Sequence, residues 1–175
     1  SKIKVDLRLD RFDLDLWAVD TNHLADGVAF LEKKYPDFAP LLFERILKNP
    51  RDPKERPEQI LASLVLPPEM RSLKDSVDRV FGDFSKEKKE LARVCQFYKF
   101  YFPKKPVPRF LAVNTGYGFG TFPVSDSLFC ISTEFFLGEN HPPYIKMLDL
   151  PDFIRRRMDK KYLASQVAES LAADA

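Results

Sequence analysis

Two histidines, His23 and His141, are the residues best suited to hold a metal ion, and they stand 118 positions apart (141 minus 23). Zinc peptidases carry two histidines four residues apart in a His-Glu-x-x-His helix, so that both imidazoles face one ion. The chain contains no such pair. A mixed site using both histidines and a carboxylate stays geometrically open. The simpler interpretation places His23 at a helix start and His141 in a loop, so no metal or cofactor is predicted.

Nucleophilic catalysis would need a serine or cysteine beside a base. The chain has two cysteines, Cys95 and Cys130, and no Gly-x-Ser-x-Gly segment. Cys95 falls on the apolar face of a predicted helix, where a thiol is inert, and Cys130 falls within a predicted strand. One disulfide between them stays open, although cysteine is also common as a small buried hydrophobe. No catalytic residue is predicted.

Three of the six glycines alternate at Gly116, Gly118 and Gly120. A phosphate-binding loop would lead from a strand into the N-terminus of a helix. Here the strand-like segment TFPVSDSLFCIS follows, and no Gly-Lys-Ser/Thr closes the loop. The pattern instead predicts a wide β-hairpin between strands at 109–115 and 126–133, in which the glycines permit positive φ.

The same glycine-rich hairpin carries three aromatic residues, Tyr117, Phe119 and Phe122. If their side chains are exposed, they form a candidate interaction surface for strand addition or for lining a groove. The alternative is that they pack inward and belong to the core.

The N-terminal segment 1–12 alternates apolar and charged residues, which predicts a half-buried strand. Asp10, Asp13 and Asp15 lie at its end. We expect these carboxylates on a solvated face of the strand rather than in a catalytic pair.

Glu134 follows an apolar strand and precedes two phenylalanines, so we expect it to be partly buried. A buried carboxylate must be paired or protonated. The basic run at 155–161 offers partners, and we expect a structural ion pair between Glu134 and Arg157 rather than a general acid. The run could also dock acidic partners or lipid head groups, but a solvated helix end is the simpler interpretation.

Length and composition indicate one soluble-type α+β domain over 1–175, mostly helical, with an N-terminal strand and the glycine-rich β-hairpin. The net charge of +2 gives no reason to expect nucleic acid as a partner, and no apolar stretch is long enough to span a membrane. Helices are predicted at 21–35, 38–49, 57–65, 68–84, 85–102 and 159–175, with a shorter one after Pro151.

Four stretches, taken in order, resemble the gliding motility lipoprotein GldB family of Bacteroidota. They are LEKKYPDFAPLLFERIL, YKFYFPKKPVPRFLAVNTG, LFCISTEFFLGENHPPYIKM and LPDFIRRRMDKKYLASQVAESLA, at 31–47, 98–116, 128–147 and 150–172. The opening RFDLDLW also fits. The resemblance implies a periplasmic, lipid-anchored envelope protein associated with gliding and type IX secretion. Members are longer and usually carry a lipobox cysteine near their start, so this chain fits an N-terminal portion or a short homologue without its signal segment and anchor.

The family is also distantly similar to zincin metallopeptidases, in which a hairpin precedes the metal-binding helix. In this chain the last predicted helix takes that place, and it carries Glu169 but no histidine. The resemblance therefore implies a zincin-like scaffold without the zinc site. The expected function is non-enzymatic binding of envelope proteins. The alternatives are a hydrolase whose catalytic residues are lost or lie outside this chain, and a lipid- or small-ligand-binding domain.

Overall fold

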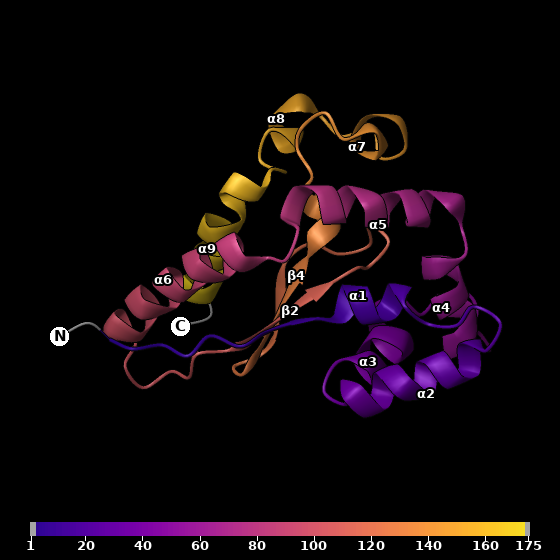
Figure 1. Cartoon of the computed structure of the whole chain (residues 1–175), viewed down its shortest axis with the longest axis horizontal. Helices are drawn as coiled ribbons and strands as arrows, with labels where there is room; N and C mark the ends of the chain where they lie inside the picture. The colour runs from indigo at the N-terminus through magenta and orange to yellow at the C-terminus, as the bar shows by residue number, and fades with distance from the viewer. Residues whose placement is uncertain (1–2, 174–175) are drawn as a thin grey trace.

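The computed structural model describes residues 3–173 and has an α+β fold around a four-stranded sheet (Figure 1). The strand order is β1-β2-β4-β3, with β1, β2 and β4 parallel and β3 antiparallel to β4. The strands are β1 (Leu9–Arg11), β2 (Arg109–Val113), β3 (Phe122–Ser125) and β4 (Leu128–Ser132).

Helices form most of the rest of the described chain. They are α1 (Phe12–Trp17), α2 (Leu24–Lys34), α3 (Ala39–Leu41), the π-helical η1 (Leu42–Ile46), α4 (Pro57–Val65), α5 (Pro68–Phe81), α6 (Ser85–Tyr101), the 3-10 helix η2 (Thr133–Phe135), α7 (Pro142–Lys146), α8 (Asp152–Arg155), the 3-10 helix η3 (Lys160–Tyr162) and α9 (Leu163–Ala173). Proline occupies the first helical position of α4, α5 and α7, where its missing N–H costs nothing. Within residues 3–173, no helix combines the length and apolarity needed to cross a membrane.

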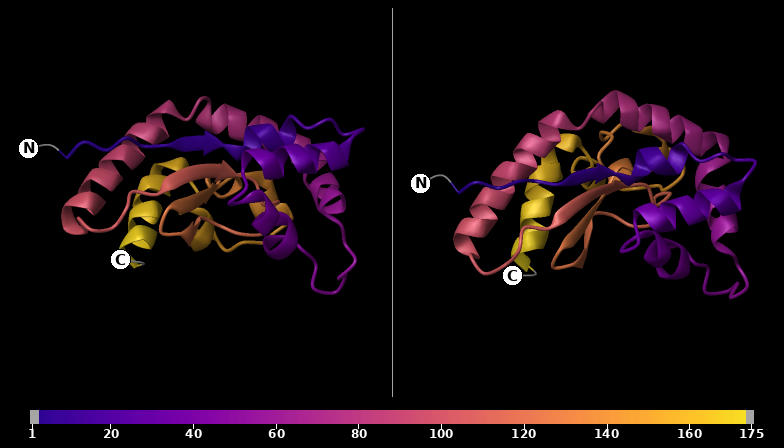
Figure 2. Two further views of the ribbon diagram at one scale, coloured as in Figure 1. Left: turned by 90° about the horizontal axis from the view of Figure 1, so that it is seen from below. Right: turned by 60° about the horizontal axis from the view of Figure 1, so that its bottom comes forward.

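Helices cover both faces of the sheet. Successive strand residues point to opposite faces, so each strand contributes side chains to two separate cores. Leu111 and Val113 pack against the core formed by α1 to α4. Phe110 and Ala112 pack on the other side against α5, α6 and α9. Figure 2 shows α5 and α6 joined in a continuous arch along one side of the sheet. This double covering explains why β2 and β4 are apolar runs without alternation.

The predicted hairpin between 109–115 and 126–133 is wrong. Its two strands, β2 and β4, are neighbours but run parallel. The hairpin that forms joins β3 to β4 through Asp126 and Ser127, and the glycine-rich segment is the connection from β2 to β3. β3 contains Pro123, which an edge strand tolerates because its outer N–H needs no partner.

The N-terminal strand is shorter than predicted. Only Leu9–Arg11 belongs to the sheet, although burial still alternates from exposed Lys4 to buried Leu7. The first two residues of the predicted segment lie outside the described residues. Asp13 is in α1 rather than on a strand, and its side chain is buried.

The two cysteines are not bridged. Cys95 in α6 and Cys130 in β4 are free thiols buried on opposite sides of the sheet, in the two separate cores. Burial raises the pKa of both thiols well above the ordinary value, which keeps them protonated.

Candidate functional site

Buried polar side chains gather at one edge of the sheet. Each of the three parallel strands is followed, or ended, by such residues, and none of them is more than 2% exposed. They are Asp13 after β1, Asn114 and Thr115 after β2, and Ser132, Thr133 and Glu134 at the end of β4. Because the carboxyl ends of parallel strands meet at the same edge, these groups form one polar layer. That edge is where open sheets with parallel strands usually bind ligands.

Glu134 is the centre of this layer. Its Oε1 accepts hydrogen bonds from the backbone N–H of Thr115 at 2.7 Å and of Tyr117 at 3.3 Å, and it lies 2.8 Å from the Thr115 hydroxyl. Its Oε2 is buried and has no hydrogen-bond partner among residues 3–173. Burial raises the pKa of Glu134 to about 7, against the opposing effect of these hydrogen bonds. The carboxyl group can therefore change its protonation near neutral pH.

The glycine-rich loop thus does surround an acidic group, but that group is a side chain of the protein. Residues 114–121 turn the amides of Thr115 and Tyr117 toward Glu134. Of the three alternating glycines, Gly116 alone has a left-handed φ, of +62°, and the next residue, Tyr117, has φ of +63°. The loop therefore binds the Glu134 carboxyl group of the same chain with its backbone N–H groups, as a phosphate-binding loop binds a phosphate.

This geometry predicts unequal costs for two glycine substitutions. Gly116→Ala should destabilise the protein by about 1–2 kcal/mol, because an L-residue is strained in the left-handed region. Its Cβ would also lie 3.2 Å from Leu64 Cδ2. Gly120→Ala is the matched control, since its Cβ would meet no atom within 4 Å. Urea unfolding measures both, and equal stabilities would contradict the assigned loop conformation.

Tyr117 points into the protein. Its hydroxyl lies 2.7 Å from His141 Nε2, and its ring contacts the rings of Phe135 and Tyr144. Burial lowers the pKa of His141 to about 4, so its imidazole is neutral at pH 7. The Tyr144 hydroxyl donates to the Glu134 carbonyl at 2.5 Å and accepts from the Leu137 N–H at 3.1 Å. These bonds connect the loop, η2 and α7 into one network.

The remaining two aromatic residues of the predicted interaction surface differ in exposure. Phe119 is 47% exposed, while Phe122 is half-buried, and their rings meet edge to face. Of the three residues, Phe119 therefore presents the most surface to a partner, and Tyr117 belongs to the part-buried network with His141.

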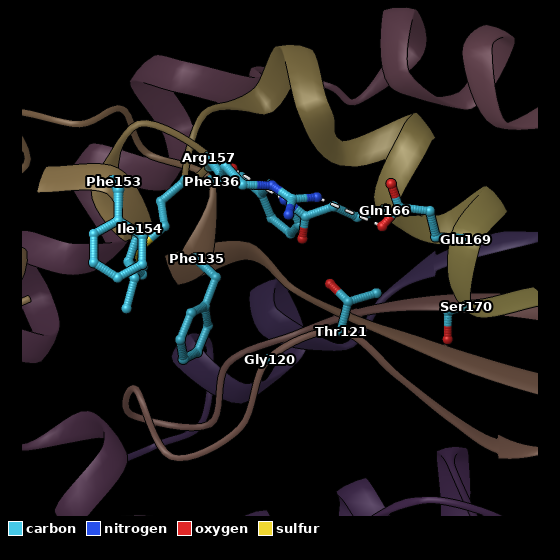
Figure 3. A pocket seen from close by; sticks show the side chains of 11 residues that line it. Gly120, Thr121, Phe135, Phe136, Phe153, Ile154, Arg157, Gln166, Glu169 and Ser170 are labelled. Atoms are coloured by element: carbon cyan, nitrogen blue, oxygen red, sulfur yellow. Dashed lines mark hydrogen bonds and ion pairs between the residues drawn. The ribbon is translucent and has the colours of Figure 1, made fainter. Parts of the chain in front are cut away.

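A cleft of about 600 Å³ opens beside this network, between the glycine-rich loop, η2, α8 and α9 (Figure 3). It is lined by Gly120, Thr121, Phe135, Phe136, Phe153, Ile154, Arg157, Met158, Gln166, Glu169 and Ser170. Figure 3 shows Phe135, Phe153 and Ile154 grouped at one end. Arg157, Gln166 and Glu169 lie at the other end, above Thr121. The cleft thus has an apolar half and a polar half.

Comparison with known proteins identifies the family. A family model described as gliding motility protein GldB matches residues 1–175. The chain belongs to the GldB family. Neither the curated proteins nor the solved structures yielded a match. GldB membership links the chain to gliding motility, and the lipoprotein designation of the family links it to the cell envelope. The expected zincin-like fold gains no support, because no solved structure matches.

Glu134 and Arg157 do not form the ion pair that we expected in this GldB chain. Arg157 Nη2 lies 3.5 Å from Glu169 Oε2 across the cleft, and both side chains are exposed. Glu134 is enclosed by backbone N–H groups of the loop, which the sequence pattern of charges could not reveal.

The candidate metal ligands of the GldB chain are not brought together. His23 Nδ1 lies 2.7 Å from Asp20 Oδ2 at the start of α2, His141 bonds Tyr117, and Glu169 pairs with Arg157. Across residues 3–173, the structure places no three histidine, cysteine or acidic side chains close enough to hold one ion.

Sequence reasoning missed the buried pair Arg11–Asp13 and the residues Asn114 and Thr115. Two apolar strands are each followed directly by a polar pair, Asn114-Thr115 and Thr133-Glu134. Had both strands been predicted to be parallel, this repetition would have indicated the polar edge. Phe153 and Ile154 of α8 were also missed, because no periodicity marks a four-residue helix.

Proposed function

We propose that this GldB-family chain is a protein-binding component of the gliding and type IX secretion machinery, and that its cleft receives a segment of a partner protein. The observation that carries the proposal is the exposed apolar wall of the cleft. Phe153 is 72% exposed and Ile154 is 40% exposed, side by side in sequence on α8. Family membership supports the cellular setting.

The shape of the cleft favours a peptide segment with apolar side chains and a polar flank. Its volume of about 600 Å³ lies in the range of ordinary binding pockets. Clustered exposed apolar side chains rimmed by polar groups are typical of interaction sites. The Arg157–Glu169 pair sits at the polar end, where either member can exchange its exposed partner for a charged group of the bound segment.

Phe119 gives the proposed surface a second contact point. It lies on the loop that leads to Gly120 of the cleft, and its ring is 47% exposed. The proposal uses Phe119 but not Tyr117, whose side chain is committed to His141 and the core.

We expect gliding to be abolished in a gliding bacterium whose native gene is replaced by one that encodes Phe153→Ser/Ile154→Ser. The partner would first be captured by photo-crosslinking from position 153 in the envelope and then purified. Truncating a hot-spot residue at the centre of an interface costs about 2 kcal/mol or more, so the Kd for the purified partner should rise about thirtyfold. Phe119→Ser should have a smaller effect in the same direction.

Phe30→Ser is the matched control, because Phe30 is 49% exposed on α2, away from the cleft residues. Bacteria that carry Phe30→Ser should glide like the wild type, and the purified variant should match the wild type in affinity for the partner and in Tm. Normal gliding of the Phe153→Ser/Ile154→Ser variant, at wild-type abundance, would refute the proposed role of the cleft.

A further inference from the structure

A second exposed surface lies on α6, away from the cleft. The solvent side of this helix is basic in its first half and aromatic in its second. Its members, which we call the α6 stripe, are Lys86, Lys89, Arg93, Phe97, Phe100 and Tyr101. The three rings are 62%, 66% and 69% exposed, among the largest exposed apolar side chains of the molecule.

Helix geometry puts these residues on one side. At 3.6 residues per turn, the spacings from Lys86 to Arg93, Phe97 and Phe100 return to nearly the same direction. The opposite side of α6 carries Leu91 and Cys95, which are buried in the core. The stripe is therefore a continuous face of a 17-residue helix that nothing in residues 3–173 covers.

The cations of the stripe form no close ion pair within residues 3–173. Lys86, Lys89 and Arg93 take part in no ion pair recorded for residues 3–173. Two acidic residues lie near them: Glu90 on the same helix, and Asp83, whose carboxylate interacts with the Lys89 charge over a longer range. Lys99 is different, because its ammonium group donates to the carbonyls of Pro103 and Lys105 and so caps the helix end. The cations of the stripe favour an anionic partner.

We infer that the α6 stripe docks the protein onto an anionic lipid surface. Aromatic rings that lie beside lysine and arginine on one helix face are suited to the boundary between head groups and acyl chains. The phenyl rings would enter the head-group region while the three cations meet lipid phosphates. An acidic protein would satisfy the cations but would leave three neighbouring rings needing an apolar groove as well.

The α6 stripe and the cleft use different parts of the molecule. The residues that line the cleft belong to other elements. A protein docked through α6 therefore keeps its cleft available, and this inference does not depend on the proposed function of the cleft.

The test is flotation of the purified chain with vesicles of phosphatidylethanolamine and phosphatidylglycerol, and with vesicles of phosphatidylcholine alone. We expect binding to the anionic vesicles that weakens with added salt. Each basic residue near an anionic surface contributes about fivefold to partitioning, so Lys86→Gln/Lys89→Gln/Arg93→Gln should weaken it on the order of a hundredfold. Phe97→Ser/Phe100→Ser/Tyr101→Ser should also remove binding to the anionic vesicles.

Two control variants test whether the position of the residues matters, or only the loss of positive charge or of an exposed ring. Lys33→Gln/Arg51→Gln/Lys54→Gln removes three exposed cations elsewhere, and Phe30→Ser removes an exposed ring elsewhere. Both should bind vesicles like the wild type. The inference is overturned if the wild type does not float with anionic vesicles, or if the two triple charge variants lose binding equally. It is also overturned if the stripe variants lose the crosslinked protein partner but keep vesicle binding.

Discussion

The free energy of unfolding of Glu134→Gln is expected to rise relative to that of the wild type as the pH rises. This difference should change by about 3 kcal/mol between pH 4.5 and pH values above 7. The pKa of the folded carboxyl group is about 7, against an ordinary value of 4.5. Below pH 4.5 the group is protonated in both folded and unfolded chains. Between the two values the folded protein holds a proton that the unfolded chain has released, so wild-type stability falls as the pH rises. The neutral amide of Gln does not titrate, and its oxygen can keep the bonds of Oε1.

The difference between the two proteins is the useful quantity, because His141 acts in the opposite sense. Its pKa in the folded state is about 4, below its ordinary value of 6.5. Between these values the unfolded chain binds the extra proton, so His141 makes the protein more stable as the pH rises. The two effects oppose each other in the wild type, where the raised pKa of Asp13 adds a further pH dependence, so the profile of the wild type alone does not isolate Glu134.

Urea unfolding of both proteins across this range measures the difference directly. Glu139→Gln, at an exposed position five residues further along, is the control for loss of a carboxylate. A Glu134→Gln difference that stays constant with pH would show that Glu134 ionises alike in the folded and unfolded chains, and that the loop is not built around a protonated carboxyl group.

Arg11→Met is expected to destabilise the protein by about 3–5 kcal/mol, because it leaves a buried carboxylate without its cation. The Arg11 guanidinium bonds both oxygens of Asp13, at 2.8 and 2.9 Å, and lies over the Phe84 ring. The Asp13 side chain is fully buried, and this burial raises its pKa despite the Arg11 pair. Loss of the arginine removes the main compensation for that desolvation.

The double variant Arg11→Met/Asp13→Asn should recover most of the lost stability, since a neutral pair needs no desolvated charge. Arg8→Met is the surface control. Arg8 lies 3.9 Å from Asp10, and both side chains are largely exposed, so the expected change is within about 0.5 kcal/mol. If Arg11→Met and Arg8→Met had equal effects on chemical unfolding, Asp13 would have to be hydrated in the folded protein.

The sequence predicts the long helices well, for a physical reason. α5 and α6 bury Leu73, Val77, Leu91 and Cys95 at helical spacing, and prolines mark where α4 and α5 begin. Such patterns are local and can be read within one element. The predicted boundaries of these helices lie within three residues of the observed ones.

The sheet could not be predicted as it is, because pairing is not local. Apolar runs such as 109–113 and 128–132 show that two strands are buried, but not whether they run parallel. β4 lies between β2 and β3 in the sheet although it follows both in the chain, and no local pattern of residues records that order. Local patterns of residues therefore favour the simpler hairpin.

The sequence predicts that Glu134 is buried, but it does not predict which groups bond to its carboxyl group. Burial of Glu134 is predictable from its apolar neighbours. Its bonds to backbone N–H groups of the loop are not predictable, because nearly every residue type carries such a group. The alternating pattern of its segment predicts Asp13 on the solvated face of a strand. One residue after β1 the chain turns into α1, and this turn carries Asp13 inward.

The pairing of β1 with β2 also sets an order of folding. Leu9 pairs with Phe110, 101 residues later in the chain (110 minus 9). At a synthesis rate of ~5–20 residues per second, the first strand exists for ~5–20 s before its partner has been made. Closing so long a loop is slow, while α2 and α4 can pack early through shorter loops. β1 therefore stays unpaired until β2 has been made, and during that interval its apolar residues need protection from other chains.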